Sequence, residues 1–309
     1  MKASHNTVGI IGLGIMGGRM AQALAAQGWR VVGYDPLARC RTALRKAGGL
    51  PLKDNAEVAR QADILITSLP SADALHAVVQ EIAAASPPRR GQVLVETSTL
   101  TLEDKQKAAL ALQGQDRQML DAPISGTASG DPQATWVAYL SGPARACRQA
   151  QAVMRCFTLQ APRVGAFGDG TKLKYAANHL VAIYNVACAE MTVLCARMGL
   201  DPAMALQLLG NSPYLGTGLM RIRMPMMLKR SYQPATMKVH LWQKDMQVIG
   251  ETARRLQCPT PMLDASASLY TSAMALGHAE SDTASVVEVL RQMSGQAPTQ
   301  VKRAQRLRR

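Results

Sequence analysis

Short apolar runs alternate with amphipathic stretches through the first half of the chain. Five runs predict strands, and several of them are nearly continuously apolar, as strands of a parallel sheet covered on both faces should be. They are Val8–Gly12, Arg30–Asp35, Ile64–Leu69, Gln92–Glu96 and Gln118–Asp121. The stretches between them have helical spacing and include Gly18–Gln27, Leu37–Ala47 and Ala72–Ala85. This βαβ series predicts an α/β fold with a doubly wound Rossmann sheet at the N-terminus.

The pattern changes after Gly168, where strand-like runs nearly vanish. A long helix is predicted from about Thr171 to Met198, because Gly199 suits a helix end and Asp201-Pro202 suits the start of the next helix. Apolar residues cover most of the circumference of the long helix, so we expect it to be buried. The rest of the chain predicts an all-α C-terminal domain, joined to the sheet through this long interdomain helix.

The expected organisation is a Rossmann NAD-binding domain at 1–167, an all-α substrate and dimerisation domain at 168–295, and a basic, flexible tail at 296–309. A chain of 309 residues is long enough for two domains. Aromatic residues make up only 4% of the chain, whereas methionines number 17. Aliphatic side chains and methionine must therefore fill the core, which suits packed helices.

The formal charge of +14 raises the question of nucleic-acid binding. Five of the cations lie in the last nine residues, and the chain lacks the interleaved aromatic and basic residues that stack on bases. We therefore expect no nucleic-acid partner. The remaining positive charge suits the attraction of anionic substrates and cofactors.

The sequence carries no targeting, membrane or metal signal that we recognise. The first seven residues are too short and too polar for a signal peptide, and the uncharged run Tyr175–Ala189 is shorter than the roughly 20 apolar residues of a membrane span. The six cysteines form no C-x-x-C pair and have no nearby histidine at metal-ligand spacing. We expect a cytoplasmic protein with reduced thiols, no metal and no membrane partner.

A dinucleotide-binding signal follows the first predicted strand. The run Gly12-Leu13-Gly14-Ile15-Met16-Gly17 lies between that strand and a helix, where its glycines allow a tight turn and close approach of a pyrophosphate. Asp35 ends the second strand, where a carboxylate accepts the ribose 2′-hydroxyl of NAD and repels the 2′-phosphate of NADP. NAD is the expected cofactor, and Arg39 and Arg41 lie close enough to make NADP possible.

Lys174 and Asn178 share one face of the predicted long helix, one turn apart. A partly desolvated lysine can exchange a proton with a substrate hydroxyl, although a helical lysine is more often a solvated surface residue. Ser125, Gly126 and Thr127 follow the end of another predicted strand. Their amides and hydroxyls could bind a carboxylate, although such a tract is more often a plain loop.

With these motifs the chain resembles the β-hydroxyacid dehydrogenase family, which includes 3-hydroxyisobutyrate dehydrogenase, tartronate semialdehyde reductase and L-threonate dehydrogenase. The resemblance runs from Val8 to about Gly295. The motifs that carry it are, in order, Gly12–Gly17, Leu69-Pro70, Ser98-Thr99, Asp121-Ala122-Pro123-Ile124-Ser125-Gly126, Gly168-x-Gly170-x-x-x-Lys174-x-x-x-Asn178 and Lys244-Asp245.

The resemblance implies an oxidoreductase that transfers a hydride between NAD(H) and a small β-hydroxy acid or its semialdehyde or keto acid. It implies that Lys174 is the general acid/base, that Asn178 fixes Lys174 and the reacting oxygen, and that Ser125–Thr127 bind the substrate carboxylate. The implied cofactor contacts are Gly12, Leu13, Gly14, Ile15, Met16 and Gly17 at the pyrophosphate, together with Leu69, Pro70, Thr99 and Lys244.

The chain departs from the family pattern where the substrate binds. The family usually has a glycine in place of Thr127, and the segment Asn211–Gly218 matches no particular member. The substrate is therefore open between 3-hydroxyisobutyrate and a tartronate- or threonate-like polyhydroxy acid. The added hydroxyl of Thr127 favours a polyhydroxy acid, because buried polar groups discriminate against ligands that leave them unpaired.

Two other functions are compatible with the same scaffold. One is an imine reductase, which generally lacks the lysine that this chain has at Lys174. The other is a non-catalytic binding protein that keeps the fold, although the retained Lys174, Asn178 and glycine loop argue against it. From the apolar circumference of the long helix we expect a homo-oligomer, a dimer or tetramer, in which the helical domains pack together.

Overall fold

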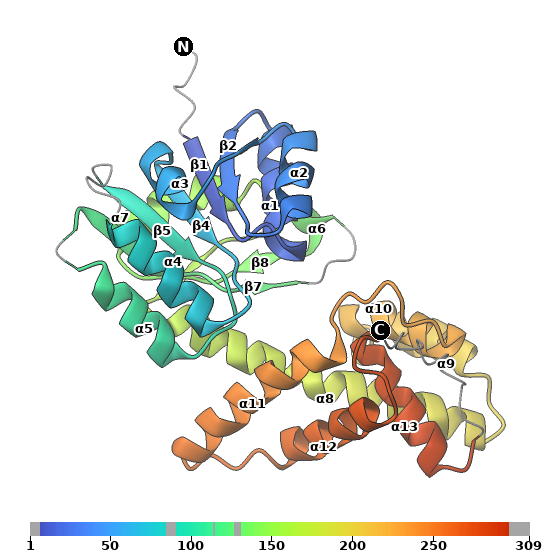
Figure 1. Ribbon diagram of the computed structural model, residues 1–309. Helices are drawn as coiled ribbons and strands as arrows, with labels where there is room; N and C mark the ends of the chain where they lie inside the picture. The colour runs from blue at the N-terminus through green and yellow to red at the C-terminus, as the bar shows by residue number, and fades with distance from the viewer. Residues whose placement is uncertain (1–6, 85–90, 114, 127–130, 297–309) are drawn as a thin grey trace, which may run out of the picture. The chain divides into compact units, whose positions relative to one another are not determined.

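The computed structural model describes residues 7–84, 91–113, 115–126 and 131–296, which fold into two compact units (Figure 1). The first unit comprises Met1–Lys174 and the second Tyr175–Arg309. The change of unit falls inside one long helix, α8 (Asp169–Arg197), so that the first turn of this helix belongs to the first unit.

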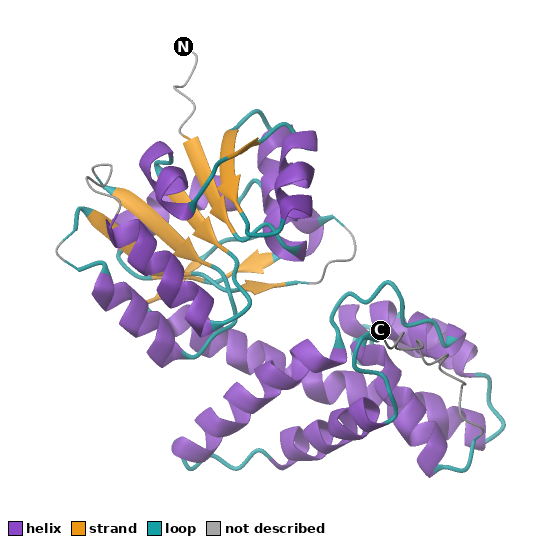
Figure 2. Cartoon of the chain, viewed as in Figure 1, coloured by secondary structure: helices purple, strands orange, loops and turns teal. Residues whose placement is uncertain are grey.

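The first unit is built on an eight-stranded sheet with the order β10-β9-β6-β5-β4-β1-β2-β3. Figure 2 shows the strands of this unit in orange among its helices in purple. The paired strands of this sheet are parallel except for β6 and β9. From β3 to β6 this is the Rossmann order, in which the chain reverses direction across the sheet between β1 and β4. The strands are β1 (Thr7–Ile11), β2 (Arg30–Tyr34), β3 (Leu50–Pro51), β4 (Ile64–Thr67), β5 (Gln92–Glu96), β6 (Arg117–Asp121), β9 (Leu140–Ser141) and β10 (Arg163–Gly165).

All five predicted strands are present, as β1, β2, β4, β5 and β6. The pattern missed the remaining strands, which have two or three residues each and are too short for a hydrophobic period to show. Among these are β7 (Ile124–Ser125) and β8 (Val137–Ala138), which form a separate antiparallel pair. This pair bears on the site, because it contains the predicted substrate residue Ser125.

Helices cover both faces of the sheet, since alternate residues of each strand point to opposite sides. Ile10 and Val95 face a core that includes α1 and α7, whereas Leu65 and Leu94 face a core that includes α3, α4 and α5. The doubly wound Rossmann architecture expected from the sequence is therefore confirmed. The helices of this unit are α1 (Ile15–Ala26), α2 (Ala38–Lys46), α3 (Asn55–Gln61), α4 (Ala72–Ala84), α5 (Leu102–Ala111), α6 (Pro132–Thr135) and α7 (Ala144–Met154).

The described part of the second unit is helical, as expected. After α8 come α9 (Pro202–Gly210), α10 (Gly218–Lys229), α11 (Val239–Arg255), α12 (Pro261–Ala275), a 3₁₀ turn (Thr283–Ser285) and α13 (Val286–Met293). The predicted helix boundary is confirmed: Gly199 adopts a φ of 77°, and the Asp201 side chain accepts a hydrogen bond from the Ala203 amide at the start of α9. Glycine suits that positive φ because it has no Cβ.

The expectation that the long helix is buried all round is wrong for the single chain. Ala182 and Val186 lie in the core of the second unit, at 0% and 7% exposure. Leu180, Tyr184 and Leu194, on other faces of α8, are 47%, 42% and 58% exposed. Within one chain α8 is thus a core helix that leaves several large apolar side chains uncovered.

Within the described residues, α8 is the one helix long and apolar enough to cross a membrane, judged by length and composition alone. Core helices of soluble proteins pass the same test, and 44% of its most apolar stretch is buried inside the protein. Asn185 in this helix is 1% exposed and donates hydrogen bonds to Tyr270 Oη (2.6 Å) and Thr283 O (2.9 Å). Such bonds to two other elements of the unit are typical of a core helix.

Candidate active site

The carboxyl ends of four parallel strands meet at one edge of the sheet. The register places Ile11 beside Thr67, Thr67 beside Glu96, and Glu96 beside Asp121, so the last residues of β1, β4, β5 and β6 form one row. The loops that leave this row contain the glycine run, Leu69-Pro70, Ser98-Thr99 and Ser125-Gly126. Ligands of doubly wound sheets bind at this edge, at the point where the strand order reverses.

The glycine loop has the geometry that a dinucleotide requires. Gly12 has a φ of 87°, and a Cβ added there would lie 2.2 Å from Ser68 O. A Cβ on Gly17 would lie 1.9 Å from Gly12 O, so both positions must remain glycine for the loop to close. Gly14, at the N-terminus of α1, faces open space within 4 Å, which leaves room for a phosphate to approach the helix amides.

Asp35 is buried and already holds the glycine loop. Its Oδ2 accepts a hydrogen bond from the Leu13 amide and its Oδ1 accepts one from the Leu37 amide, each at 2.8 Å. The Arg41 guanidinium donates to Asp35 O (2.6 Å) and Pro36 O (2.9 Å), so a cation lies beside the acidic residue that the sequence assigned to cofactor choice. An acidic and a basic group thus lie side by side just after β2, where an acidic residue in dinucleotide-binding folds accepts the ribose 2′-hydroxyl of NAD.

The predicted substrate loop is only partly described. Ser125 is half-buried in β7 and pairs with Val137 of β8, while Gly126 is exposed and lies close to the buried Trp136. A Cβ on Gly126 would lie 2.4 Å from Trp136 Cδ1, which explains a glycine at this position. Thr127 lies outside the described residues.

Lys174 and Asn178 lie one turn apart on α8, as the sequence predicts. Lys174 is only 8% exposed, so it is not a solvated surface lysine. In the second unit, Asn178 Nδ2 donates a hydrogen bond to Asp245 Oδ2 at 3.0 Å. Lys244 Nζ lies 3.7 Å from Asp245 Oδ1, so Asp245 lies next to both Asn178 and Lys244. Asp245 was not predicted as a site residue, although it belongs to the Lys244-Asp245 motif.

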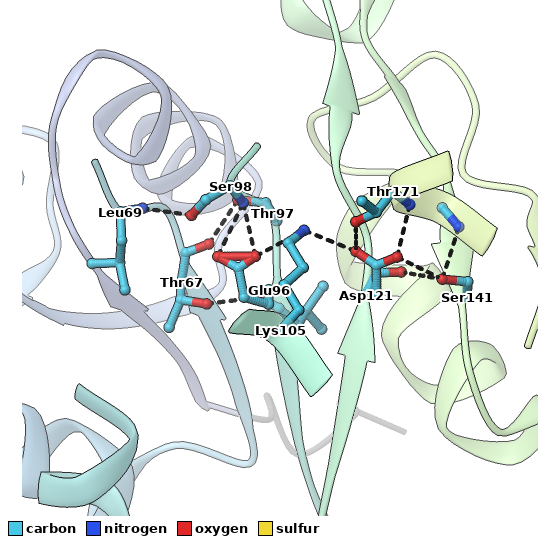
Figure 3. Close-up of polar contacts among 11 residues, drawn as sticks. Thr67, Leu69, Glu96, Thr97, Ser98, Lys105, Asp121, Ser141 and Thr171 are labelled. Atoms are coloured by element: carbon cyan, nitrogen blue, oxygen red, sulfur yellow. Dashed lines mark hydrogen bonds and ion pairs between the residues drawn. The ribbon is translucent and has the colours of Figure 1, made fainter. Parts of the chain in front are cut away.

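A buried charge cluster at the carboxyl edge was not predicted from the sequence; it is formed by Glu96, Lys105 and Asp121 (Figure 3). Lys105 Nζ lies 3.2 Å from Glu96 Oε2 and 2.8 Å from Asp121 Oδ1, and all three side chains are fully buried. The sequence did contain a signal for this cluster. Helical spacing places a lysine, Lys105, in the same apolar stripe as Ala108 and Leu112, and all three are buried.

Burial lowers the pKa of Lys105, but the attraction of the Glu96 and Asp121 carboxylates outweighs this and holds the pKa above its usual range. Lys105 therefore keeps its proton and its positive charge. Burial also raises the pKa of Glu96, which the charge of Lys105 offsets in part. The ion pairs thus exist because the charges compensate one another away from water.

Within the described residues, no group of three or more His, Cys, Asp or Glu side chains is placed to hold a metal ion. The cysteines are free thiols; Cys258 is exposed and four others are buried. Burial raises the pKa of Cys188 to about 11, which keeps that thiol protonated and unreactive at neutral pH.

Both parts of the chain match known families. Residues 7–165 match the family described as the NAD binding domain of 6-phosphogluconate dehydrogenase, and residues 168–290 match the family described as the NAD-binding domain of NADP-dependent 3-hydroxyisobutyrate dehydrogenase. The first match alone spans more than half of the chain.

Individual proteins resemble the chain over nearly its whole length. L-threonate dehydrogenase from Cupriavidus necator is 29% identical over 286 residues, which cover 91% of this chain and 95% of the relative. The fold resembles that of 3-hydroxyisobutyrate dehydrogenase from Mycobacterium tuberculosis, with a TM-score of 0.82, 24% identity, and coverage of 93% and 99%. An imine reductase from Pseudomonas sp. is similar with a TM-score of 0.60, 20% identity, and coverage of 93% and 100%.

The open space at Gly14 yields a test of the cofactor site. A methyl group in Gly14→Ala meets no protein atom within 4 Å, but it enters the space that a pyrophosphate needs. Because Gly14 is the N-cap of α1, we expect the unliganded variant to unfold within a few degrees of the wild type, about 4 °C at most. We expect its Kd for NADH to rise about tenfold or more. Thermal unfolding and NADH fluorescence titration measure the two quantities.

The matched control for this test is Gly250→Ala, which also meets nothing within 4 Å but lies in α11 of the second unit. Its NADH affinity should equal that of the wild type. Unchanged NADH affinity in Gly14→Ala would show that the loop does not hold a pyrophosphate.

Proposed function

Because the chain belongs to the β-hydroxyacid dehydrogenase family, we propose that it transfers a hydride between NAD(H) and a small β-hydroxy acid, with Lys174 as the general acid/base. The observation that carries this proposal is the placement of Lys174. Thr171, one turn earlier in α8, donates its amide to Asp121 at the end of β6 (2.8 Å). Lys174 therefore lies one helical turn beyond a residue that is hydrogen-bonded to the sheet edge where the substrate loop begins.

The residues around this edge suit an NAD(P) cofactor. When bound, the nicotinamide ring supplies or accepts the hydride. The glycine loop and the N-terminus of α1 hold the pyrophosphate, while Leu69, Pro70 and Thr99 contact the cofactor from the neighbouring loops. Asp35 favours NAD over NADP, and Arg41 beside it admits some use of NADP.

Lys174 moves the proton. In oxidation its neutral amine takes the proton of the substrate hydroxyl, and in reduction its ammonium returns a proton to the developing alkoxide. Asn178, oriented by its hydrogen bond to Asp245, fixes the amine and the reacting oxygen. The Ser125 and Gly126 region, together with Thr127, binds the carboxylate of the acid, and Lys244 contacts the cofactor. Holding both reactants in one orientation lowers the barrier further.

Two alternatives are less well supported. An imine reductase has a similar fold, but the buried lysine at Lys174 suits proton exchange with a hydroxyl. A non-catalytic binding protein would not need Lys174, Asn178 and an intact glycine loop together. Absorbance at the NADH band with a panel of three- and four-carbon hydroxy acids and cyclic imines separates all three functions.

The substrate is a polyhydroxy acid of the threonate type. This assignment rests on Thr127, which adds a hydroxyl where the family usually has glycine, and on the similarity to L-threonate dehydrogenases. A site built to hydrogen-bond a hydroxyl rejects analogues that lack it.

The protein works as a cytoplasmic homo-oligomer in which second units pack together. The apolar surface of α8 supports this: Leu180, Tyr184 and Leu194 remain 42–58% exposed in one chain, and a second copy would remove them from water.

Removing the amine of Lys174 tests the chemistry. We expect Lys174→Ala to lower kcat roughly 100-fold or more while NADH affinity barely changes, since general acid–base groups supply 10²–10⁴ in rate. Steady-state kinetics and NADH titration measure this. Lys172→Ala is the control: its side chain is 63% exposed on the same helix, and its loss should leave kcat unchanged. Equal losses of turnover and cofactor binding in Lys174→Ala would remove Lys174 from the acid/base role.

Kinetics with two acids test the substrate class. We expect kcat/KM to be about tenfold higher for L-threonate than for 3-hydroxyisobutyrate, and Thr127→Gly to narrow the difference. The same assays with NADP in place of NAD test the cofactor preference. A preference for 3-hydroxyisobutyrate that Thr127→Gly leaves unaltered would contradict the assignment.

Light scattering tests the assembly. Leu194 of α8 and Leu110 of α5 are each 58% exposed in the single chain. We expect the wild type and Leu110→Glu to be oligomeric at micromolar concentration, whereas Leu194→Glu dissociates because a charge would be buried between subunits. A monomeric wild type would refute the proposal.

A further inference from the structure

The two acidic residues of the buried cluster oppose each other across neighbouring strands. Glu96 and Asp121 are register partners in β5 and β6, and both lie on the face covered by α5, since Leu94 and Met119 two residues earlier belong to that core. Like charges placed directly opposite destabilise a sheet. Lys105 of α5 lies between the two carboxylates and contacts both.

Glu96 holds the loops that leave β4 and β5. Its carboxylate oxygens accept hydrogen bonds from the Ser98 amide at 3.0 and 3.1 Å. Ser98 Oγ in turn accepts a hydrogen bond from the Leu69 amide at 2.8 Å. One carboxylate therefore fixes the positions of Ser98 and Leu69, which precede Thr99 and Pro70 of the proposed cofactor site (Figure 3).

Asp121 holds the first turn of α8. Its Oδ2 accepts a hydrogen bond from the Thr171 amide (2.8 Å), and its Oδ1 accepts one from the Thr171 hydroxyl (2.7 Å). Ser141 Oγ, which donates to Asp121, also accepts the Gly170 amide at 3.0 Å. A Cβ on Gly170 would lie 2.3 Å from Tyr139 O, so this turn is pressed against the sheet edge. A carboxylate at a helix N-terminus also interacts favourably with the helix dipole.

Stability alone does not explain this cluster. Replacing a buried ion pair by apolar residues is often neutral or stabilising, because burial of charge is costly. What the cluster does provide is a shared anchor for the two loops that leave β4 and β5 and for the start of α8, built on two carboxylates that would otherwise repel each other.

We propose that Lys105 is a positioning residue for the reaction: by keeping Glu96 on Ser98 and Asp121 on Thr171, it sets where Lys174 lies relative to the cofactor loops. This inference rests on the proposed function of Lys174. Without the Lys105 charge the two carboxylates repel each other and turn apart, so the Ser98 loop and the first turn of α8 are no longer held in fixed positions relative to each other. Misplacement of reacting groups by about 1 Å can cost 10²-fold in rate.

Lys105→Met, which keeps the length of the side chain and removes its charge, tests the proposal. We expect kcat to fall about tenfold or more, with a smaller change in KM, because a misplaced Lys174 affects the transition state more than substrate binding. Measurements at a temperature well below the unfolding transition keep every variant folded. If Lys105→Met does not fold, Lys105→Gln replaces it with the same expected outcomes.

The matched structural control is Arg117→Met. Arg117 is also buried and hydrogen-bonded to β5, through Gln92 Oε1 at 2.6 Å, but it lies at the opposite, amino end of β6. We expect Arg117→Met to lower the free energy of unfolding and to keep kcat within about twofold of the wild type. An equal loss of kcat in both variants, or a kcat of Lys105→Met within about twofold of the wild type, would overturn the proposal.

A compensating variant tests the mechanism. In Glu96→Gln/Lys105→Met the repulsion is gone, so Asp121 can return to Thr171 while the amide oxygen of the new side chain at position 96 can still accept from Ser98. We expect kcat to recover about threefold or more relative to Lys105→Met, a non-additive effect of contacting residues. The absence of any recovery would contradict a role through the two carboxylates.

Hydrogen exchange supplies a readout that does not depend on activity. In Lys105→Met, peptides that contain the Ser98 and Thr171 amides should exchange about tenfold faster, whereas in Arg117→Met they should match the wild type. Unchanged protection of both amides would refute the positioning role. A wild-type protein that oxidises no hydroxy acid would refute the proposed function, and exchange together with NADH affinity would still decide whether Lys105 positions the loops.

Discussion

The parallel register of β1, β4, β5 and β6 is the constraint on which the rest of the structure depends. Parallel strands put their carboxyl ends on one edge, and here the row Ile11, Thr67, Glu96 and Asp121 aligns them residue by residue. Each loop that leaves the row therefore begins at this edge of the sheet, so four sequence motifs that lie far apart along the chain converge there.

This convergence places two buried carboxylates side by side, and their mutual repulsion is compensated by a buried cation. Loops at a strand end expose amides, and carboxylates at the end of β5 and β6 are natural acceptors for them. Two adjacent acceptors of the same charge cannot remain buried without a cation, and Lys105 supplies it from the helix that covers that face. The glycine loop follows a similar logic, since the Asp35 carboxylate accepts the Leu13 amide and so ties β2 to the turn after β1.

Elements with a clear hydrophobic period were predicted from the sequence, whereas elements that depend on tertiary contacts were missed. The strands β1 and β5 and the boundary between α8 and α9 followed from apolar runs and from Gly199 and Asp201. Strands of two residues, such as β7, have no period to detect. The partnership of Lys105 with Glu96 and Asp121 could not be predicted, because it depends on which strands are neighbours and which face α5 covers. The exposed side of α8 was mispredicted because apolar content does not reveal which face finds a partner within the chain.

Some residues of the candidate site were likewise predicted from local motifs, whereas others required knowledge of the tertiary packing. Lys174, Asn178 and the glycine loop were visible as motifs, whereas Asp245 as the partner of Asn178 required the packing of α11 against α8 to be known. The spacing of Lys174 and Asn178 is nonetheless set by local structure alone, because residues four apart on a continuous helix stay about 6 Å apart at Cβ. Lys174 ends the first unit and Asn178 lies in the second, yet α8 runs through both without a break. The proposed proton-transfer pair therefore keeps its internal geometry as long as this helix stays intact. The position of this pair also depends on where α8 begins. Asp121, which Lys105 contacts, fixes that position through its hydrogen bond from the Thr171 amide.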